Sequence, residues 1–528
     1  MIVKPKYAVS LVLAIMFTLW GIGIAGAQDG EVTITLNGDT ATVTGEGAVA
    51  DNNLVTITAA GTYNLSGTLS EGQLVVDTEG AVSIKLNGVE MSSATSAPIY
   101  VKNAEAVELM LVDGTQNVIT SSAAYEVDND ALNAAIFSDA AFTISGNGSL
   151  AVVSDASDGI VSSASITVDG APAISISAGD DTIQTDESFT LINGELNLVA
   201  GGGSSNTLSE ELSGKGIKAE GNITIENGTV TIDAFDDAIR AEGDLVMNAG
   251  TVTITAIGKA LHGTYNLEIN GGTIKVFTCD EGIEGGFITI NDGDINIVAT
   301  DDAINVSEPD DVPNPTLYYL HINGGNIVVD AAGDGLDANG SIVMTGGVVI
   351  VNGPTIFDNG ALDYDGTFEM TGGLLIAAGS AGMAVAPSET SSQYSAMITF
   401  DTVLDPGTLV HIQTSDGVAL LTFAPSKSFQ SLVYSAPELA EGGSYDVYYG
   451  GSSDGTATGG LYSDGTYSPG TLLANFTVSG AVSRVGNVQG GPGGGMPPGG
   501  EMPEGGMRPE GGAPPEGGMP PADGAATG

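Results

Sequence analysis

Several residue types that common folds and common ligands require are scarce in this sequence. Cys279 is the one cysteine in 528 residues, which excludes a disulfide framework and a cysteine-based zinc site. Lysine and arginine number 12 against 65 aspartates and glutamates, for a net charge of -53. A nucleic-acid-binding surface needs clustered positive charge, so this balance argues against nucleic acid as a partner. Aromatic residues make up only 5% of the chain.

The residues that are abundant favour β-structure with a large core. Hydrophobic residues make up 42% of the chain, which argues against wholesale disorder. Most of them are Val, Ile, Leu and Ala, interleaved with Thr, Asn and 78 glycines. This is the composition of an all-β protein with many turns.

The first segment has the pattern of a secretory signal peptide. Lys4 and Lys6 precede an apolar run over 8–24, and small residues at 25–27 supply a cleavage site. We therefore expect a secreted or cell-surface protein whose mature chain starts near Gln28, without stable membrane insertion after cleavage. The alternative is an uncleaved anchor, because the run is close to the minimum of about 17 residues that spans a bilayer.

A repeat of about 22 residues organises the middle of the chain. In each copy a turn of Asn, Asp or Gly followed by Gly separates two short alternating strands, as in 223–232, and a third strand follows, as in 239–241. The turn glycines are Gly170, Gly194, Gly228, Gly250, Gly272, Gly293, Gly325, Gly347 and Gly373. Three strands in about 22 residues predict one coil of a right-handed parallel β-helix, with strands of successive coils ~4.8 Å apart. A propeller blade would need about 40 residues.

The period fades after Gly379, where separate β-strands with tyrosine pairs replace it. This stretch is expected to be a C-terminal β cap, which a solenoid needs over its open end. The predicted organisation is a signal peptide at 1–27, an N-terminal β region with the first coils at 28–128, a parallel β-helix core at 129–378, a C-terminal β region at 379–485, and a disordered or extended Gly/Pro/Met-rich tail at 486–528.

Aligning the coils places charged residues at one turn position, which we call the turn column. Its members are Asp158, Asp181, Lys215, Asp237, Lys259, Glu281, Asp302 and Asp334, and the preceding position adds Asp180, Asp236, Asp280 and Asp301. Like charges ~4.8 Å apart repel by ~1 kcal/mol in water and by more at lower dielectric. Lys215 and Lys259 compensate the column beside Asp237, but other coils lack a lysine.

Calcium is the predicted compensation in those other coils, because it prefers six to eight oxygen ligands. The predicted ligands are Asp280, Glu281, Asp301 and Asp302, with a second candidate set formed by Asp158, Asp180 and Asp181. The alternative is that these aspartates are turn formers whose side chains bond backbone amides.

Three residues beyond the turn column, side chains are expected to point outward in a second line, the outward ladder. It reads Gln184, Lys218, Arg240, His262, Glu284, Asn305, Asp337 and Asp363. Cations gather in one part of these two lines, and we call Lys215, Lys218, Arg240, Lys259 and His262 the cation strip. The predicted ligand-binding residues are Lys218, Arg240, His262, Glu284, Asn305, Lys215 and Lys259.

The cation strip suits an acidic polysaccharide, whose uronate groups can pair with Arg and Lys or bridge through calcium. The alternative is that these cations only offset neighbours such as Glu220 and Glu242. Insertions at 201–212 and 307–319 adjoin this face, and Tyr318 and Tyr319 are candidates either for stacking on sugar rings or for packing at the coil edge. Cys279 is expected to be a buried thiol in the interior stack.

The chain resembles a family of secreted bacterial carbohydrate-binding proteins with a right-handed parallel β-helix similar to that of pectate lyases. The segments that carry the resemblance are 57–69 (Ile-Thr-Ala-Ala-Gly-Thr-Tyr-Asn-Leu-Ser-Gly-Thr-Leu), 97–104 (Ala-Pro-Ile-Tyr-Val-Lys-Asn-Ala), 133–138 (Asn-Ala-Ala-Ile-Phe-Ser) and 146–150 (Gly-Asn-Gly-Ser-Leu), together with the Asp-Asp-x-Ile coil turns and the Gly-Pro-Met tail. The resemblance implies binding of cellulose or acidic sugars such as polygalacturonate, with calcium at coil-turn carboxylates and no general catalytic activity. Lys215 and Lys259 depart from the acidic pattern, so calcium is not expected at their coils.

Three functions remain open at the level of sequence. The leading hypothesis is a secreted, monomeric, non-catalytic carbohydrate-binding protein. The second is a calcium-dependent polysaccharide lyase in which Arg240 or a lysine abstracts the proton α to a uronate carboxylate, although no second arginine on an adjacent coil supports it. The third is a structural cell-surface or matrix protein in which calcium only rigidifies the rod.

Overall fold

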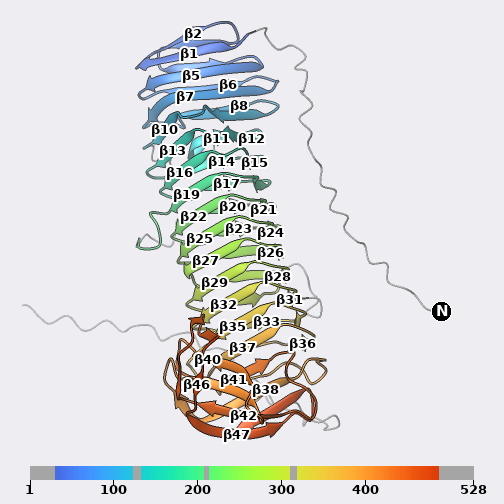
Figure 1. Cartoon of the computed structure of the whole chain (residues 1–528). Coiled ribbons are helices and arrows are strands. Elements are labelled where there is room, and N and C mark those ends of the chain that lie inside the picture. The colour runs from blue at the N-terminus through green and yellow to red at the C-terminus, as the bar shows by residue number, and fades with distance from the viewer. Residues whose placement is uncertain (1–29, 123–131, 207–212, 310–317, 487–528) are drawn as a thin grey trace, which may run out of the picture.

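The computed structural model describes residues 30–122, 132–206, 213–309 and 318–486. The described residues form β-strands, turns and loops, and the predicted all-β class is confirmed. Strands from the N-terminal end to the middle of the chain are stacked one above another along a single axis (Figure 1). The predicted signal peptide and residues 487–528 of the predicted tail lie outside the described residues.

Most strands pair in parallel with the equivalent strand of the next coil, three elements later in the chain, as in a solenoid. The coils therefore build three stacks of parallel strands. The first stack, which carries the outward ladder, contains β4 (Leu54–Ile57), β6 (Gln73–Asp77), β8 (Ile99–Asn103), β11 (Ala134–Ser138), β14 (Asp158–Ser162), β17 (Ile183–Thr185), β20 (Ile217–Ala219), β23 (Ile239–Ala241), the first parts of β26 (Leu261–Ile269) and β28 (Ile283–Ile290), β30 (Ile304–Val306) and β33 (Leu336–Ala338).

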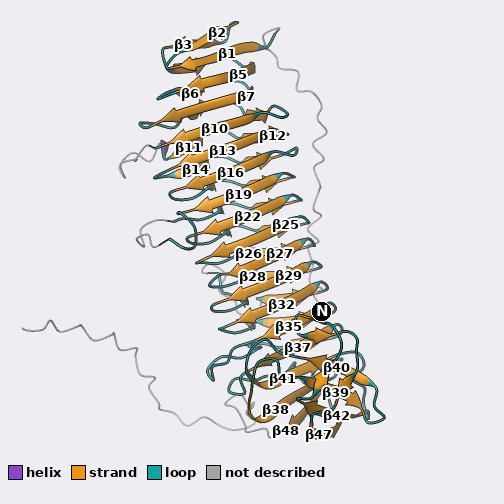
Figure 2. Cartoon of the chain, turned by 60° about the vertical axis from the view of Figure 1, so that its left-hand side comes forward, coloured by secondary structure: helices purple, strands orange, loops and turns teal. Residues whose placement is uncertain are grey.

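The other two stacks follow the same rule. The second stack contains the first parts of β5 (Gly61–Leu69) and β7 (Val82–Ser93), then β9 (Val107–Leu111), β12 (Phe142–Gly146), β15 (Ile166–Val168), β18 (Phe189–Leu191), β21 (Ile223–Ile225), β24 (Leu245–Met247), the second parts of β26 and β28, β31 (Tyr319–Ile322), β34 (Ser341–Met344) and β36 (Phe368–Met370). The third stack contains the second parts of β5 and β7, then β10 (Gln116–Ser121), β13 (Ser149–Ser154), β16 (Ala173–Ala178), β19 (Glu195–Ala200), β22 (Thr229–Ala234), β25 (Thr251–Ala256), β27 (Thr273–Thr278), β29 (Asp294–Ala299), β32 (Asn326–Ala331), β35 (Val348–Asn352) and β37 (Leu374–Gly379). Figure 2 shows the third stack running along the length of the molecule.

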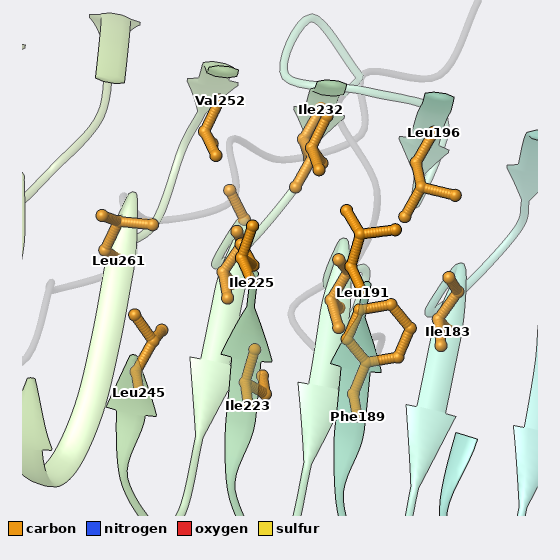
Figure 3. Close-up of a cluster of buried hydrophobic side chains, with 14 of the residues drawn as sticks. Ile183, Phe189, Leu191, Leu196, Ile223, Ile225, Ile232, Leu245, Val252 and Leu261 are labelled. Atoms are coloured by element: carbon orange, nitrogen blue, oxygen red, sulfur yellow. The ribbon is translucent and has the colours of Figure 1, made fainter. Parts of the chain in front are cut away.

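Aliphatic side chains from all three stacks fill the space between them. Figure 3 shows Ile183 of the first stack, Leu191 and Ile225 of the second, and Ile232 of the third in one cluster, all at most 1% exposed. Because alternate residues of a strand face opposite sides, each coil places its apolar residues inside and its polar residues outside. Full burial of one such side chain contributes about 1.5–3 kcal/mol, and every coil repeats it.

The turns between the second and third stacks explain the recurring glycines. Gly250 has a φ of 93°, a backbone conformation that residues with a side chain rarely adopt. A Cβ at this position would also lie 2.6 Å from the carbonyl oxygen of Gly228 in the preceding coil. Glycine therefore satisfies both the backbone conformation and the close stacking of one turn on the next.

Both ends of the stack depart from parallel pairing. At the N-terminal end, β1 (Val32–Gly38) pairs antiparallel with β2 (Ala41–Thr44), and β3 (Ala48–Asp51) pairs antiparallel with β4. At the other end, β37 pairs antiparallel with β41 (Phe429–Ser435), which also pairs with β38 (Ser395–Leu404). The remaining strands are β39 (Val410–Thr414), β40 (Ala419–Phe423), β42 (Ser444–Tyr449), β43 (Ser452–Ser453), β44 (Ala457–Thr458), β45 (Leu461–Tyr462), β46 (Tyr467–Ser468), β47 (Thr471–Thr477) and β48 (Val482–Gly486).

These C-terminal strands have a core of their own beside the last coils. It joins Ile350 and Ile376 of the third stack with Phe423 and Tyr434 of the C-terminal strands. The outer surface of the third stack is therefore covered at its C-terminal end and open further up (Figure 1). Within the described ranges, no helix has the length and apolarity that a membrane crossing requires. The hand of the coil and the domain boundaries stay predictions.

Candidate carbohydrate-binding face and metal centre

Carboxylates of the turn column bind backbone amides of the following coil. Five such bonds join Asp158 Oδ1 to Asp181 N at 3.0 Å, Asp181 Oδ1 to Lys215 N at 2.7 Å, Asp237 Oδ1 to Lys259 N at 2.8 Å, Asp302 Oδ1 to Asp334 N at 2.6 Å, and Asp334 Oδ1 to Gly360 N at 2.5 Å. One oxygen of each carboxylate thus satisfies a turn amide that has no ladder partner. The alternative considered from the sequence, that these aspartates form turns by bonding backbone amides, is therefore present at these coils. The second oxygen of each carboxylate does not change this role.

The structure does not gather the four carboxylates first predicted to bind calcium, Asp280, Glu281, Asp301 and Asp302. The Glu281 carboxylate instead accepts hydrogen bonds from Lys259 Nζ at 3.3 Å and from Asn305 Nδ2 at 3.2 Å. The side chain of Asp280 is exposed and accepts a long hydrogen bond of 3.4 Å from Thr300. The Lys259 side chain extends to Glu281 in the next coil, a contact that the order of residues in the turn column does not reveal.

The second predicted set, Asp158, Asp180 and Asp181, is also not assembled around one point. Asn133 donates to Asp158 at 2.7 Å, and Asp180 accepts from the amide of Gly214 at 2.8 Å. Burial and the neighbouring carboxylates raise the pKa of Asp158 well above its usual range. Burial, then the charge of Asp180, raises the pKa of Asp181 to about 6. Hydrogen bonds from Asn133 and from backbone amides of the following coil therefore offset part of the repulsion here.

A different group of carboxylates meets further along the stack, and we call Asp334, Asp337 and Asp363 the acidic cluster. One carboxylate oxygen from each lies within 4.8 Å of the others, and no other group of three or more His, Cys, Asp or Glu side chains in the described residues does so. Asp334 comes from the turn column and Asp337 from the outward ladder. A bridge between Leu336 and Leu362 sets Asp363 beside them.

Electrostatics in the acidic cluster are unfavourable without a bound cation. Burial raises the pKa of Asp337 to about 7, with further contributions from Asp302, Asp334 and Asp363. Burial likewise raises the pKa of Asp302 to about 6 and that of Asp334 above its ordinary value. Within the described ranges, no lysine or arginine forms an ion pair with the acidic cluster.

An uncharged oxygen adjoins the acidic cluster. Asn305 pairs with Asp337 in the parallel register of the first stack. Its Oδ1 atom is buried and has no hydrogen-bond partner, although its Nδ2 atom donates to Glu281. An unsatisfied buried oxygen beside three carboxylates fits a hard cation with oxygen ligands. The sequence carries one signal for this site. Asp334 of the turn column and Asp337 of the outward ladder are both acidic and lie three residues apart in the same coil.

The outward ladder is a continuous line in the structure. The strand register pairs Gln184 with Lys218, Lys218 with Arg240, Arg240 with His262, His262 with Glu284, and Glu284 with Asn305. Short three-residue strands place one outward side chain in each coil. The structure therefore brings together the residues predicted to bind a ligand, in the order expected from the coil alignment.

Carboxylates occupy the cation strip. Lys215 pairs with Asp236, Lys218 with Glu220 at 3.4 Å, and Arg240 with Asp237 at 3.1 Å and with Glu242 at 2.6 Å. Burial lowers the pKa of Arg240, but hydrogen bonds from its guanidinium to Glu242 and Asp237 outweigh burial and raise that pKa overall. The neighbour-offsetting role considered for these cations is thus visible in the structure.

Glu284, which follows His262 in the outward ladder, is buried beside the cation strip. Its side chain contacts Lys259 Nζ and lies 2.7 Å from Nδ1 of His262. Burial raises the pKa of Glu284, but hydrogen bonds from His262 and Lys259 lower it to about 2. Nε2 of the same histidine lies 3.2 Å from the hydroxyl of Thr264. Glu284 is therefore ionised and held between two donors.

Comparison with known proteins supplies the family. The model of a family described as carbohydrate-binding domain-containing protein matches residues 51–188, 166–260 and 254–399. The chain belongs to this family. A carbohydrate-binding domain-containing protein from Acetivibrio thermocellus is 38% identical over 130 residues, which are 24% of this chain and 46% of the relative. The match thus spans about half the length of that relative.

A solved structure of a polysaccharide lyase-like protein from C. thermocellum, a gadolinium derivative, is 28% identical to this chain. The match covers 47% of this chain and 95% of that one, with a TM-score of 0.35.

Two further predictions concern residues near the candidate carbohydrate-binding face. Of the two roles considered for Tyr318, the structure shows packing at the coil edge, because Tyr318 is 2% exposed and lies against Phe287 with ring centroids 5.9 Å apart. Tyr319 stacks on His321, with ring centroids 3.9 Å apart. Cys279 is a buried free thiol, as predicted. Of the two insertions, 207–212 and 310–317 lie outside the described residues.

Proposed function

We propose that the protein is a secreted, non-catalytic carbohydrate-binding protein that binds acidic polysaccharide such as polygalacturonate, with calcium held at the acidic cluster. The family supports carbohydrate as the ligand class. The signal-peptide pattern supports secretion. A right-handed parallel β-helix, the usual hand for parallel crossovers, is the fold that we propose for the stacked coils.

The acidic cluster is the observation that carries the calcium proposal. Three carboxylates within 4.8 Å of one another would repel strongly when ionised, and calcium offsets this repulsion with oxygen coordination. Asp334, Asp337 and Asp363 would hold the ion, and Asn305 offers its unpartnered Oδ1 atom. Bound calcium supplies coordination positions that a uronate carboxylate can fill.

The contacts of Arg240 favour binding over lyase activity. A lyase needs a base that accepts the proton α to the uronate carboxylate. Asp237 and Glu242 hold the guanidinium through bonds of 3.1 and 2.6 Å and raise its pKa. Arg240 therefore stays protonated, and retention of the polymer is the activity that we expect to measure.

Calorimetry of calcium binding tests the metal centre. Asp337→Asn should weaken calcium binding, because it removes a carboxylate from the middle of the cluster. Asp186→Asn is the matched control, since Asp186 is exposed and outside the acidic cluster. Absence of calcium binding by the wild type, or equal affinity in wild type and Asp337→Asn, would contradict the assigned site.

Retention on immobilised polygalacturonate, with calcium and with chelator, tests the ligand. The wild type should be retained in calcium and released more readily in chelator. A wild type that passes through the polymer in both conditions would contradict the proposed function itself.

A further inference from the structure

One basic side chain of the described residues is free of carboxylates. Nine lysines and arginines lie in the described ranges, and eight of them form ion pairs. Lys275 is the ninth, with no carboxylate oxygen within 4.0 Å among the described residues. The chain has a net charge of -53, so a lysine without a carboxylate partner is unusual in it. Such a lysine is a candidate for binding an anionic ligand.

Lys275 lies on β27 of the third stack, on a different face from the cation strip. Its neighbours in the register are Thr253 on β25 and Asn296 on β29, both uncharged. The closest acidic position on an adjacent strand is Asp294, two residues before Asn296. Lys275 is exposed, and its two register neighbours carry a hydroxyl and an amide.

Phe277 stands two residues further along the same strand and is 64% exposed. Ile274 and Val276 are buried, so Lys275 and Phe277 project from the same side of β27. The register with β25 shifts between Ile254 and Thr255, and Thr255 pairs with Thr278. Phe277 is therefore skipped in that pairing. Irregular positions of this kind re-aim side chains next to functional sites.

The exposed ring has a small apolar surround. Val298 follows the residue that pairs with Val276 and is 39% exposed, and Ile257 at the end of the preceding coil is 47% exposed. Full burial of a phenylalanine contributes about 1.5–3 kcal/mol, and Phe277 forgoes most of it in the free protein. A ligand that covers the ring recovers this contribution.

The third stack is also hollowed further toward the N-terminus. A shallow cavity of about 390 Å³ lies over β13, β16, β19 and β22. Ala151, Ser175, Ser177 and Asn197 are among the small side chains that line it. Figure 2 shows these strands in one row with β25, β27 and β29. A polymer lying along the stack can therefore meet both the cavity and Phe277.

We propose that Lys275 and Phe277 form a subsite for one uronate unit of an acidic polysaccharide. The Phe277 ring covers the apolar face of the sugar, and Lys275 pairs with its carboxylate through a charge-assisted hydrogen bond. Thr253 and Asn296 bind sugar hydroxyl groups from the flanking strands. The subsite rests on the proposed function, and it places binding on the open third stack in addition to the acidic cluster.

Single substitutions separate the two contributions. In calorimetry with an oligogalacturonate and with a cello-oligosaccharide, Lys275→Gln should weaken oligogalacturonate binding about tenfold and leave any cello-oligosaccharide binding unchanged. Phe277→Ala should weaken the binding of whichever oligosaccharides the wild type binds, because every pyranose has an apolar face. Both side chains are exposed, so both variants should melt like the wild type.

Matched controls remove the same groups elsewhere. Lys102→Gln removes an exposed lysine that pairs with Asp77, and Phe357→Ala removes a phenyl ring that is 70% exposed. The subsite is overturned if Lys275→Gln and Phe277→Ala bind oligogalacturonate like the wild type, or if the controls weaken binding equally. The first result would leave the proposed function intact. A wild type that binds no oligogalacturonate would overturn the proposed function and the subsite together.

Discussion

Replacing Glu284 by glutamine tests whether the ion pairs of the first stack are structural. Glu284 is 6% exposed and is held between Lys259 and His262. Glu284→Gln keeps the shape of the side chain but removes its charge. Lys259 keeps a second partner, Glu281, at 3.3 Å, whereas the contact with His262 loses its anion.

The expected loss follows from the pKa of Glu284, which is lowered from 4.5 to about 2. A pKa difference of one unit corresponds to ~1.4 kcal/mol, so the ionised carboxylate contributes ~3 kcal/mol to the free energy of unfolding. Breaking a buried pair typically costs about 3–5 kcal/mol, which agrees. Because the folded-state pKa is lowered, this contribution is present above about pH 4.5 and is lost as the pH falls toward about 2.

Glu220→Gln is the matched control on the same face. The Glu220 side chain is 49% exposed and lies 3.4 Å from Lys218, so its loss should cost less than about 1 kcal/mol. Denaturant unfolding of both variants and the wild type at pH 7, pH 4 and pH 2 supplies the measurement. Equal destabilisation by the two variants at pH 7 would refute the reasoning. So would a Glu284→Gln deficit that does not shrink in acid.

Three further predictions concern the metal, the cation strip and catalysis. In chelator, the free energy of unfolding should fall as the pH rises from about 4 to about 7, because the pKa of Asp337 is raised to about 7 in the folded protein. At pH 8, calcium at a hundredfold excess over its Kd should restore ~2.7 kcal/mol, and thermal melts that are the same with calcium and chelator would contradict this. Combined Lys218→Ala and Arg240→Ala should lower the Tm. It should reduce polygalacturonate binding by less than about threefold, since carboxylates already pair with both cations. A larger loss of polygalacturonate binding, with retention on cellulose unchanged, would show that the cation strip binds uronates. Incubation with polygalacturonate and calcium should give no absorbance from 4,5-unsaturated uronates, and growth of absorbance that Arg240→Ala abolishes would establish the lyase.

The sequence by itself determined the repeating parts of this protein. Glycine turns recur about every 22 residues, and apolar residues alternate with polar ones on each strand. These two regularities predict the stacked parallel strands, the inward core and the line of residues from Gln184 to Asn305. They can be read from the sequence because each coil repeats the same local pattern, so a single alignment predicts the register of most neighbouring strands.

The tertiary structure alone decided which charges meet. The Lys259 side chain reaches Glu281 and Glu284 in the next coil, so Glu281 pairs with a lysine instead of joining a group of three carboxylates. Asp363 joins Asp334 and Asp337 through a bridge in a coil whose length breaks the period. Strand alternation already places Phe277 outside, but the register shift that leaves it unpaired with β25 is a property of the folded chain. Coil periodicity fixes the face on which a side chain lies, but ion pairs and metal ligands depend on differences of about an ångström between rotamers and turns, which only the folded chain sets.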